Sequence, residues 1–211
     1  MDADPHGPPA TAAGPRAEGA HPMTERTIGY IVGSISSTSI NRRLAKALER
    51  LAPAGTTLVE IPIKDLPFYS QDYDADFPQV ALDFKKAIAD VDGVIVVTPE
   101  YSRSIPGVLK NALDWAARPY GQGSFDGKPT AIIGTSGSPI GTAAAQQHLK
   151  AILNHLNAPL LGQPEGYVQS LPGVFTDSGE VTNDQTAEFL SGYLAAFNGL
   201  VDRYAKVSVG A

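Results

Sequence analysis

The sequence contains no cysteine, and this absence removes several kinds of chemistry at once. Disulfide bonds, thiolate zinc sites, iron–sulfur clusters and a cysteine nucleophile all need a thiol. Basic residues are also few, since 16 Lys and Arg stand against 22 Asp and Glu and give a formal net charge of −6. Binding to a nucleic-acid backbone needs clustered positive charge. We therefore predict no nucleic-acid partner, and we take a reducing cytoplasm as the expected location.

Long apolar runs are missing as well. No stretch approaches the roughly 20 apolar residues of a membrane-spanning helix, so we expect no membrane segment. Residues 1–24 are rich in Pro, Gly and Ala and lack the apolar core and basic start of a signal peptide. The sequence therefore predicts a disordered extension over residues 1–24 and one domain over residues 25–211.

Short β-branched runs alternate with helical stripes along the rest of the chain. The clearest run, residues 94–97, is too short for a helix and is typical of a strand buried on both faces. Similar runs occupy residues 27–32, 57–62, 129–135 and 167–169, and apolar stripes of helical period cover residues 40–51, 80–91, 106–115, 149–156 and 189–204. This alternation predicts a parallel sheet with helices on both faces, and residues 182–185 have the spacing of a capping box before the last helix.

Three loops should emerge together at the carboxyl edge of that sheet. They are the hydroxyl loop (residues 34–41), the Glu-Tyr loop (residues 99–105) and the Ser-Gly loop (residues 135–141). In the strand order 2-1-3-4-5, the first and third strands flank the switch point where such folds bind ligands. We therefore expect a ligand among these loops, with phosphate at the hydroxyl loop and a planar ring between the other two.

The hydroxyl loop carries five hydroxyl side chains and an amide where a strand meets a helix. Free N–H groups and the dipole at a helix N-terminus can hold a phosphate with little help from basic side chains. Simple helix capping by Ser and Thr is the alternative interpretation. After Gly33 the loop lacks the further glycines of a dinucleotide fingerprint, which favours a monophosphate.

Three strings in these loops resemble the NADPH-dependent FMN reductase family of flavodoxin-like proteins. They are similar to its bacterial branch of quinone, chromate and azo-dye reductases. The strings are GSISSTSINRRLA, PEYSRSIPGVLKNALDW and GKPTAIIGTSGSPIGTAAAQQHL, of which the second is the most specific. The resemblance extends over residues 27–204 and includes the late segment GEVTNDQTAEFL. It implies a flavodoxin-like three-layer fold with a five-stranded parallel sheet of order 2-1-3-4-5.

The resemblance also implies which residues bind FMN. The positions that match its phosphate site are Ser34, Ser36, Ser39, Ile40 and Asn41. Those that match the site of its isoalloxazine ring are Pro99, Glu100, Tyr101, Ser102, Ser104, Ser136 and Gly137, with Arg103 and Tyr101 on the substrate side. No side chain is expected to act as an acid, base or nucleophile, because the cofactor carries the chemistry. We expect Glu100 to bond backbone or neighbouring groups in its loop rather than to act as a base.

The implied activity is the transfer of a hydride from NADPH or NADH through FMN to a small acceptor. Quinones, azo compounds, free flavins and chromate are the acceptors that the resemblance suggests, in a homodimer or homotetramer. The alternative is a flavodoxin-like electron carrier or assembly partner without enzymatic activity. Such carriers present strongly acidic docking surfaces, whereas the acidic excess here is modest, which favours the enzyme.

The sequence departs from that branch at two places. Ser36 stands where an arginine is common, which removes a cation from the phosphate site and predicts weaker FMN binding. Ser102-Arg103 stands where Asn-Tyr is common. Arg103 either stabilises the anionic reduced ring, attracts an acidic substrate or nucleotide phosphate, or points into water.

Three weaker patterns have other interpretations. Residues 134–138 nearly match the hydrolase motif G-x-S-x-G, and His148 and His155 follow them, but the final glycine is missing. We expect the histidines to lie partly exposed or at an oligomer contact, without a metal. Trp115 is expected at a subunit interface, and the aromatic stripe over residues 189–204 in the core or at an interface.

Overall fold

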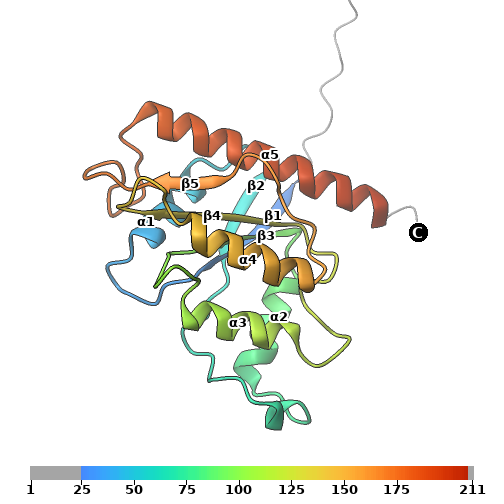
Figure 1. Ribbon diagram of the computed structural model, residues 1–211. Coiled ribbons are helices and arrows are strands. Elements are labelled where there is room, and N and C mark those ends of the chain that lie inside the picture. Colours follow the sequence, from blue (N-terminus) through green and yellow to red (C-terminus); the bar gives the residue numbers. More distant parts are fainter. Residues whose placement is uncertain (1–24, 209–211) are drawn as a thin grey trace, which may run out of the picture.

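The structure is a computed structural model that describes residues 25–208, with a five-stranded parallel sheet at its centre (Figure 1). The extension predicted over residues 1–24 lies outside the described residues. The strand order is β2-β1-β3-β4-β5, as expected. The strands are β1 (Arg26–Val32), β2 (Thr56–Glu60), β3 (Gly93–Val97), β4 (Thr130–Ser136) and β5 (Gly166–Gln169).

Helices cover both faces of the sheet and complete a flavodoxin-like three-layer fold. They are α1 (Ile40–Arg50), α2 (Gln79–Ala89), α3 (Gly107–Ala117), α4 (Ala143–His155) and α5 (Asp184–Ser208), with a short 3₁₀ turn, η1 (Gln71–Tyr73), before α2. One buried cluster joins α1 and α5 to the sheet, and a second joins α2, α3 and α4 to the opposite face. Figure 1 shows α5 across the sheet from α2 and α3. No helix within residues 25–208 is long and apolar enough to cross a membrane.

Strand β3 is the middle strand and is buried along its whole length. It pairs in parallel with β1 on one side and with β4 on the other. Because its side chains alternate between two buried clusters, an almost wholly apolar, β-branched sequence is what this position requires. The strand predicted from the run at residues 94–97 is confirmed, and its carboxyl end leads directly into the Glu-Tyr loop.

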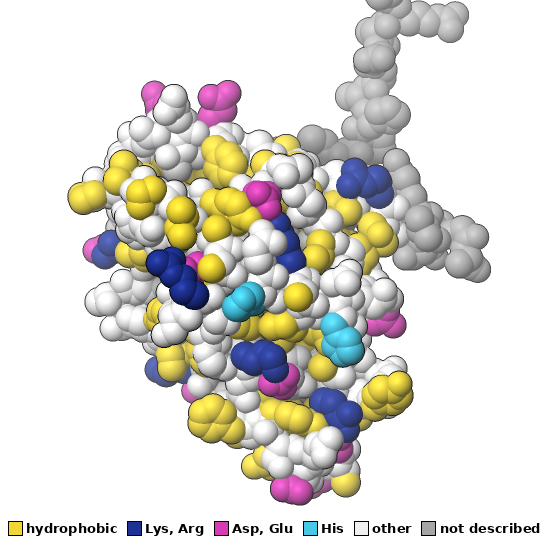
Figure 2. Space-filling model, viewed as in Figure 1, with side chains coloured by type: hydrophobic (Ala, Val, Ile, Leu, Met, Phe, Trp, Pro, Cys, Tyr) yellow, Lys and Arg dark blue, Asp and Glu magenta, His cyan; other side chains and the backbone are white. Residues whose placement is uncertain are grey.

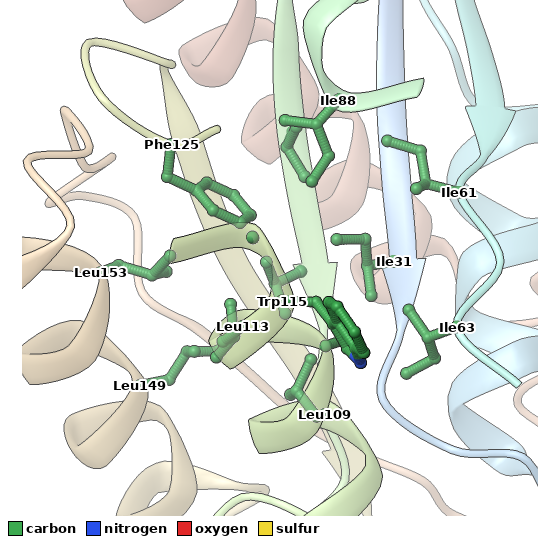
Figure 3. Packing of buried hydrophobic residues seen from close by; sticks show 14 of the residues in the cluster. Ile31, Ile61, Ile63, Ile88, Leu109, Leu113, Trp115, Phe125, Leu149 and Leu153 are labelled. Carbon is green, nitrogen blue, oxygen red and sulfur yellow. The ribbon is translucent and has the colours of Figure 1, made fainter. Parts of the chain in front are cut away.

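Trp115 lies in the core, so its expected place at a subunit interface is wrong. The side chain is fully buried, and its Nε1 donates a hydrogen bond of 2.7 Å to the carbonyl of Pro67. The rings of Tyr69, Tyr73 and Phe77 lie 5.2–5.4 Å from it, centroid to centroid. Figure 3 shows the indole packed among aliphatic side chains of the core. Trp115 therefore fixes the long segment after β2 against α3, which the local sequence pattern did not reveal.

The last helix begins one residue later than the capping-box spacing suggests. Asn183 caps it, since its Oδ1 accepts a hydrogen bond of 2.9 Å from the amide of Thr186. The Thr182 hydroxyl instead donates to the carbonyl of Gly173 at 2.7 Å. Tyr193 and Phe197 of the aromatic stripe are fully buried against the sheet, which confirms the core interpretation of that stripe.

Candidate functional site

The three loops meet at the carboxyl edge of the sheet because they follow the adjacent strands β1, β3 and β4. The strand ends approach each other closely beneath them. A Cβ atom on Gly134 would lie 2.1 Å from the carbonyl oxygen of Thr98 and 2.3 Å from Oγ1 of Thr142. Only glycine fits there, so Gly134 allows the loops after β3 and β4 to lie side by side, as the sequence predicted.

The hydroxyl groups of the hydroxyl loop bond mainly within the loop. Ser34 is buried, and its Oγ accepts a hydrogen bond of 3.3 Å from the Ser36 amide. The Ser36 hydroxyl lies 3.3 Å from that of Thr38 and accepts from the Thr38 amide. Ser39 caps α1 through its Oγ, which accepts from the Arg42 amide at 3.4 Å. The capping interpretation is therefore confirmed for Ser39.

Several backbone amides of this loop have no partner and are available to an anion. The N–H groups of Ile35, Ser37 and Ile40 donate to no other residue within 25–208. Unpaired amides at the start of an 11-residue helix, α1, suit the oxygens of a phosphate. The nearby cations are already paired with acids, Arg42 with Glu60 and Arg43 with Asp177, each at 2.8 Å. The loop therefore fits a phosphate through its backbone.

Asn41 has a positioning role that the sequence reasoning missed. Its side chain is buried, its Oδ1 accepts from the Thr135 amide, and its Nδ2 donates to the Thr135 carbonyl, both at 2.9 Å. This pair of bonds connects the first turn of α1 to the end of β4. Its oxygen and one amide hydrogen are engaged by the protein, and a contact from Asn41 to phosphate stays a prediction. Only the 94-residue separation hid the pairing.

The Glu-Tyr loop is a tight two-residue hairpin. Tyr101 and Ser104 exchange two backbone hydrogen bonds of 3.0 and 2.9 Å. Between them Ser102 has a φ of 49° and Arg103 a φ of 63°, both in the left-handed region. Two successive positive φ angles define a type I′ turn, which favours Asn and Gly and costs Ser and Arg some strain. The turn places the Arg103 side chain at the tip of the loop.

Side chains of the Glu-Tyr loop fix it against α4. The Glu100 side chain is 9% exposed; its Oε2 accepts from the Ala145 amide at 3.1 Å, and its Oε1 pairs with Arg103 at 3.0 Å. The Ser104 hydroxyl lies 3.0 Å from Nδ1 of His148. The expectation that Glu100 bonds a group in its own loop is confirmed by Arg103, and the bond to Ala145 of α4 is one that the sequence did not indicate. His148 is exposed, as expected, and it has a partner that the sequence did not indicate.

The Ser-Gly loop is closed by its own serine. The Ser136 hydroxyl donates to the carbonyl of Gly141 at 2.6 Å and accepts from the Ser138 amide at 3.1 Å. No histidine within residues 25–208 hydrogen-bonds Ser136, so the structure gives the hydrolase alternative no support. A Cβ on Gly137 would meet no atom within 4 Å, so the loop has open space beside it. The described residues contain no group of three or more His, Asp or Glu suited to a metal.

Each loop also exposes one large apolar side chain at this edge. Ile35, Tyr101 and Ile140 are about half exposed, at 52%, 53% and 49%. Exposed apolar groups beside an amide-rich anion site suit a ligand with a phosphate at one end and a planar ring at the other. Together with the doubly wound sheet and its switch point, this arrangement defines the flavodoxin-like class of flavin-binding proteins.

Comparisons with known proteins identify the family within that class. The sequence model of the NADPH-dependent FMN reductase family matches residues 26–171, and the chain belongs to this family. It is 48% identical over 178 residues to a 2-hydroxy-1,4-benzoquinone reductase of Burkholderia sp. This match covers 84% of this chain and 93% of the Burkholderia protein. It is 40% identical over 172 residues to a quinone reductase of Pseudomonas putida, covering 81% and 92% of the two chains.

A solved structure agrees with these sequence matches. The flavoenzyme FerB of Paracoccus denitrificans, an NAD(P)H:acceptor oxidoreductase, superposes with a TM-score of 0.81 and 42% identity. The match covers 85% of this chain and 98% of that one. The protein is thus an FMN-dependent oxidoreductase that takes electrons from NAD(P)H.

Proposed function

We propose that this protein reduces quinones by two electrons at the junction of the three loops. The observation that carries the proposal is the bond between Glu100 of the Glu-Tyr loop and the first turn of α4, the helix that follows the Ser-Gly loop, beside the free amides of the hydroxyl loop. Relatives that are named as reductases of quinones, including 2-hydroxy-1,4-benzoquinone, support this class of acceptor. When bound, FMN supplies the chemistry by accepting a hydride from the nicotinamide and passing it to the acceptor.

The residues of the chain bind and orient in this proposal. Free amides of the hydroxyl loop hold the phosphate, with the hydroxyls of Ser34, Ser36 and Ser39 around them. Backbone and side chains from Pro99 to Ser104 form one wall of the ring site, and Ser136 and Gly137 form the other. The open space at Gly137 leaves room for the ring edge. The proton that completes quinone reduction comes from solvent, which reaches this exposed edge.

We further propose that the protein is a cytoplasmic homo-oligomer. A groove between α3 and α4 is lined by Lys110, Leu113, Asp114, Ala117, Ala151, Ile152, His155 and Leu156. Its base is mostly apolar, and a second copy of this chain would cover it. On the face that carries α3 and α4, Figure 2 shows hydrophobic side chains around and between the two exposed histidines. Light scattering of the purified protein tests the oligomer, and a monomer at all concentrations would contradict it.

The proposed reaction is tested with the purified protein and bound FMN. Addition of NADPH without air should bleach the flavin absorbance, and one equivalent of a quinone should restore it and yield one hydroquinone. Flavin that binds but stays oxidised with NADPH and NADH would instead favour the electron carrier. Bleaching that no quinone reverses would show that quinones are the wrong acceptor class. Failure to bind added FMN would contradict the site itself.

A further inference from the structure

We propose that Arg103 selects acceptors with a negative charge spread over a quinone ring, namely deprotonated 2-hydroxyquinones. This inference rests on the proposed function and adds the electrostatic preference of the acceptor site. Arg103 is the single Lys or Arg of the hydroxyl, Glu-Tyr and Ser-Gly loops. An anionic acceptor at their junction therefore meets one nearby candidate for a charge partner on these loops.

The fold holds Arg103 at the edge of the proposed ring site. The side chain starts from the tip of the type I′ turn and is 74% exposed. One guanidinium nitrogen, Nη1, is directed by its 3.0 Å bond to Glu100. Nε and Nη2 have no hydrogen-bond partner among residues 25–208. The guanidinium is thus fixed at one nitrogen, while its other donors are available to a ligand.

The pairing with Glu100 leaves positive charge for that ligand. The second oxygen of the Glu100 carboxylate accepts a hydrogen bond from the Ala145 amide, in the first turn of the 13-residue helix α4. The positive end of the α4 dipole therefore shares the negative charge of Glu100 with Arg103. One carboxylate facing a guanidinium and a helix N-terminus leaves a net positive potential, which favours an anion over a neutral molecule of the same shape.

The chemistry of 2-hydroxyquinones matches these donors. Such a compound is a vinylogous carboxylic acid, so it is ionised at neutral pH and shares its charge between oxygens of the ring. The charged oxygen at C2 and the neighbouring carbonyl oxygen at C1 lie side by side and suit two planar donors of a guanidinium. On reduction the anion gains one hydride and two protons and becomes a neutral trihydroxyarene, while NAD(P)H is oxidised. The product therefore loses the attraction to Arg103, which favours its release.

The test compares two acceptors of nearly equal size. 2-Hydroxy-1,4-naphthoquinone is anionic at pH 7, and 2-methoxy-1,4-naphthoquinone is neutral. For Arg103→Gln we expect kcat/KM to fall about tenfold more for the anionic acceptor than for the neutral one, mainly through KM. Arg103→Lys should restore part of the difference, because it keeps the charge and loses the planar fork. Added salt should raise KM for the anionic acceptor alone.

A matched control removes one positive charge elsewhere. Lys86 lies in the last turn of α2 and forms an exposed ion pair with Asp90. Lys86→Gln breaks this pair far from Arg103, because the end of α2 lies at the amino edge of the sheet. It should leave the ratio between the two acceptors unchanged. Flavin absorbance during titration of the oxidised holoenzyme gives the affinity of each acceptor without turnover, and Arg103→Gln should weaken that of the anionic one.

The outcomes separate this inference from the proposed function. If Arg103→Gln and wild type show the same ratio of kcat/KM for the two acceptors, and the same affinity ratio, the role of Arg103 is wrong although the protein still reduces quinones. If wild type reduces neither acceptor after NADPH has bleached the flavin, the proposed quinone reductase activity is wrong, whatever the titrations show.

Discussion

The hydroxyl loop and the Glu-Tyr loop lie at the same edge of the sheet but are stabilised in different ways. The serine and threonine hydroxyls of the hydroxyl loop bond within the loop or to the first turn of α1, and its unpaired amides are available to the proposed phosphate. Glu100 and Ser104 of the Glu-Tyr loop instead bond α4. We therefore expect phosphate binding to depend on the backbone, and the shape of the proposed ring site to depend on particular side chains. Single substitutions should affect the two loops unequally.

The largest effect on stability is expected at Asn41, the residue of the hydroxyl loop whose side chain bonds another element, β4. Asn41→Ala should lower the free energy of unfolding by about 3 kcal/mol, because two buried backbone groups of Thr135 lose their partners. Chemical denaturation of the protein without FMN measures this. Asn41→Asp is the matched variant: it keeps an acceptor for the amide but turns a second oxygen toward the carbonyl. Surface substitutions usually change the free energy of unfolding by no more than about 0.5 kcal/mol. A loss no larger than this for both variants would show that the two hydrogen bonds between Asn41 and Thr135 contribute little.

A smaller loss is expected in the Glu-Tyr loop. Glu100→Ala should lower the free energy of unfolding by about 2 kcal/mol, because the Ala145 amide and Arg103 lose a charged acceptor. Glu100→Gln keeps an oxygen for the amide and should cost about half as much. Ser36→Ala, its counterpart in the hydroxyl loop, should change stability by less than about 0.5 kcal/mol. Equal losses for Glu100→Ala and Ser36→Ala would remove the contrast between the loops.

Ser36→Arg is expected to have the smallest effect on folding. It should nevertheless change the affinity for FMN clearly. This exposed position lacks the cation that is common in the resembling branch, and an arginine there should lower the Kd for FMN about tenfold at low salt. Ser36→Gln has a long side chain without charge and serves as the control. Fluorescence titration of the protein with FMN at two salt concentrations measures the effect. A gain that persists in high salt, or that Gln reproduces, would argue against an ionic cause.

Much of this architecture could be predicted from local patterns. The strand at residues 94–97 and the helix from residue 40 follow from apolar periodicity, which depends on neighbours in the sequence. The parallel sheet and the three loops at its edge follow from the alternation of strands and helices. The strand order and the FMN residues came from the family resemblance. The start of α5 was one residue off, since Asn183 and Thr182 are both acceptable caps and only the packing chose between them.

The sequence by itself determined that this chain forms a doubly wound fold with a hydroxyl-rich loop at the start of its first helix and a Glu-Tyr loop beside it. The tertiary structure alone decided the partners: Asn41 with Thr135, Glu100 with Ala145, and Trp115 with the segment after β2. Local pattern cannot specify these contacts, because each joins groups brought together only when distant elements pack on the sheet. The same packing fixes one side of Arg103 and leaves its other donors available for an acceptor.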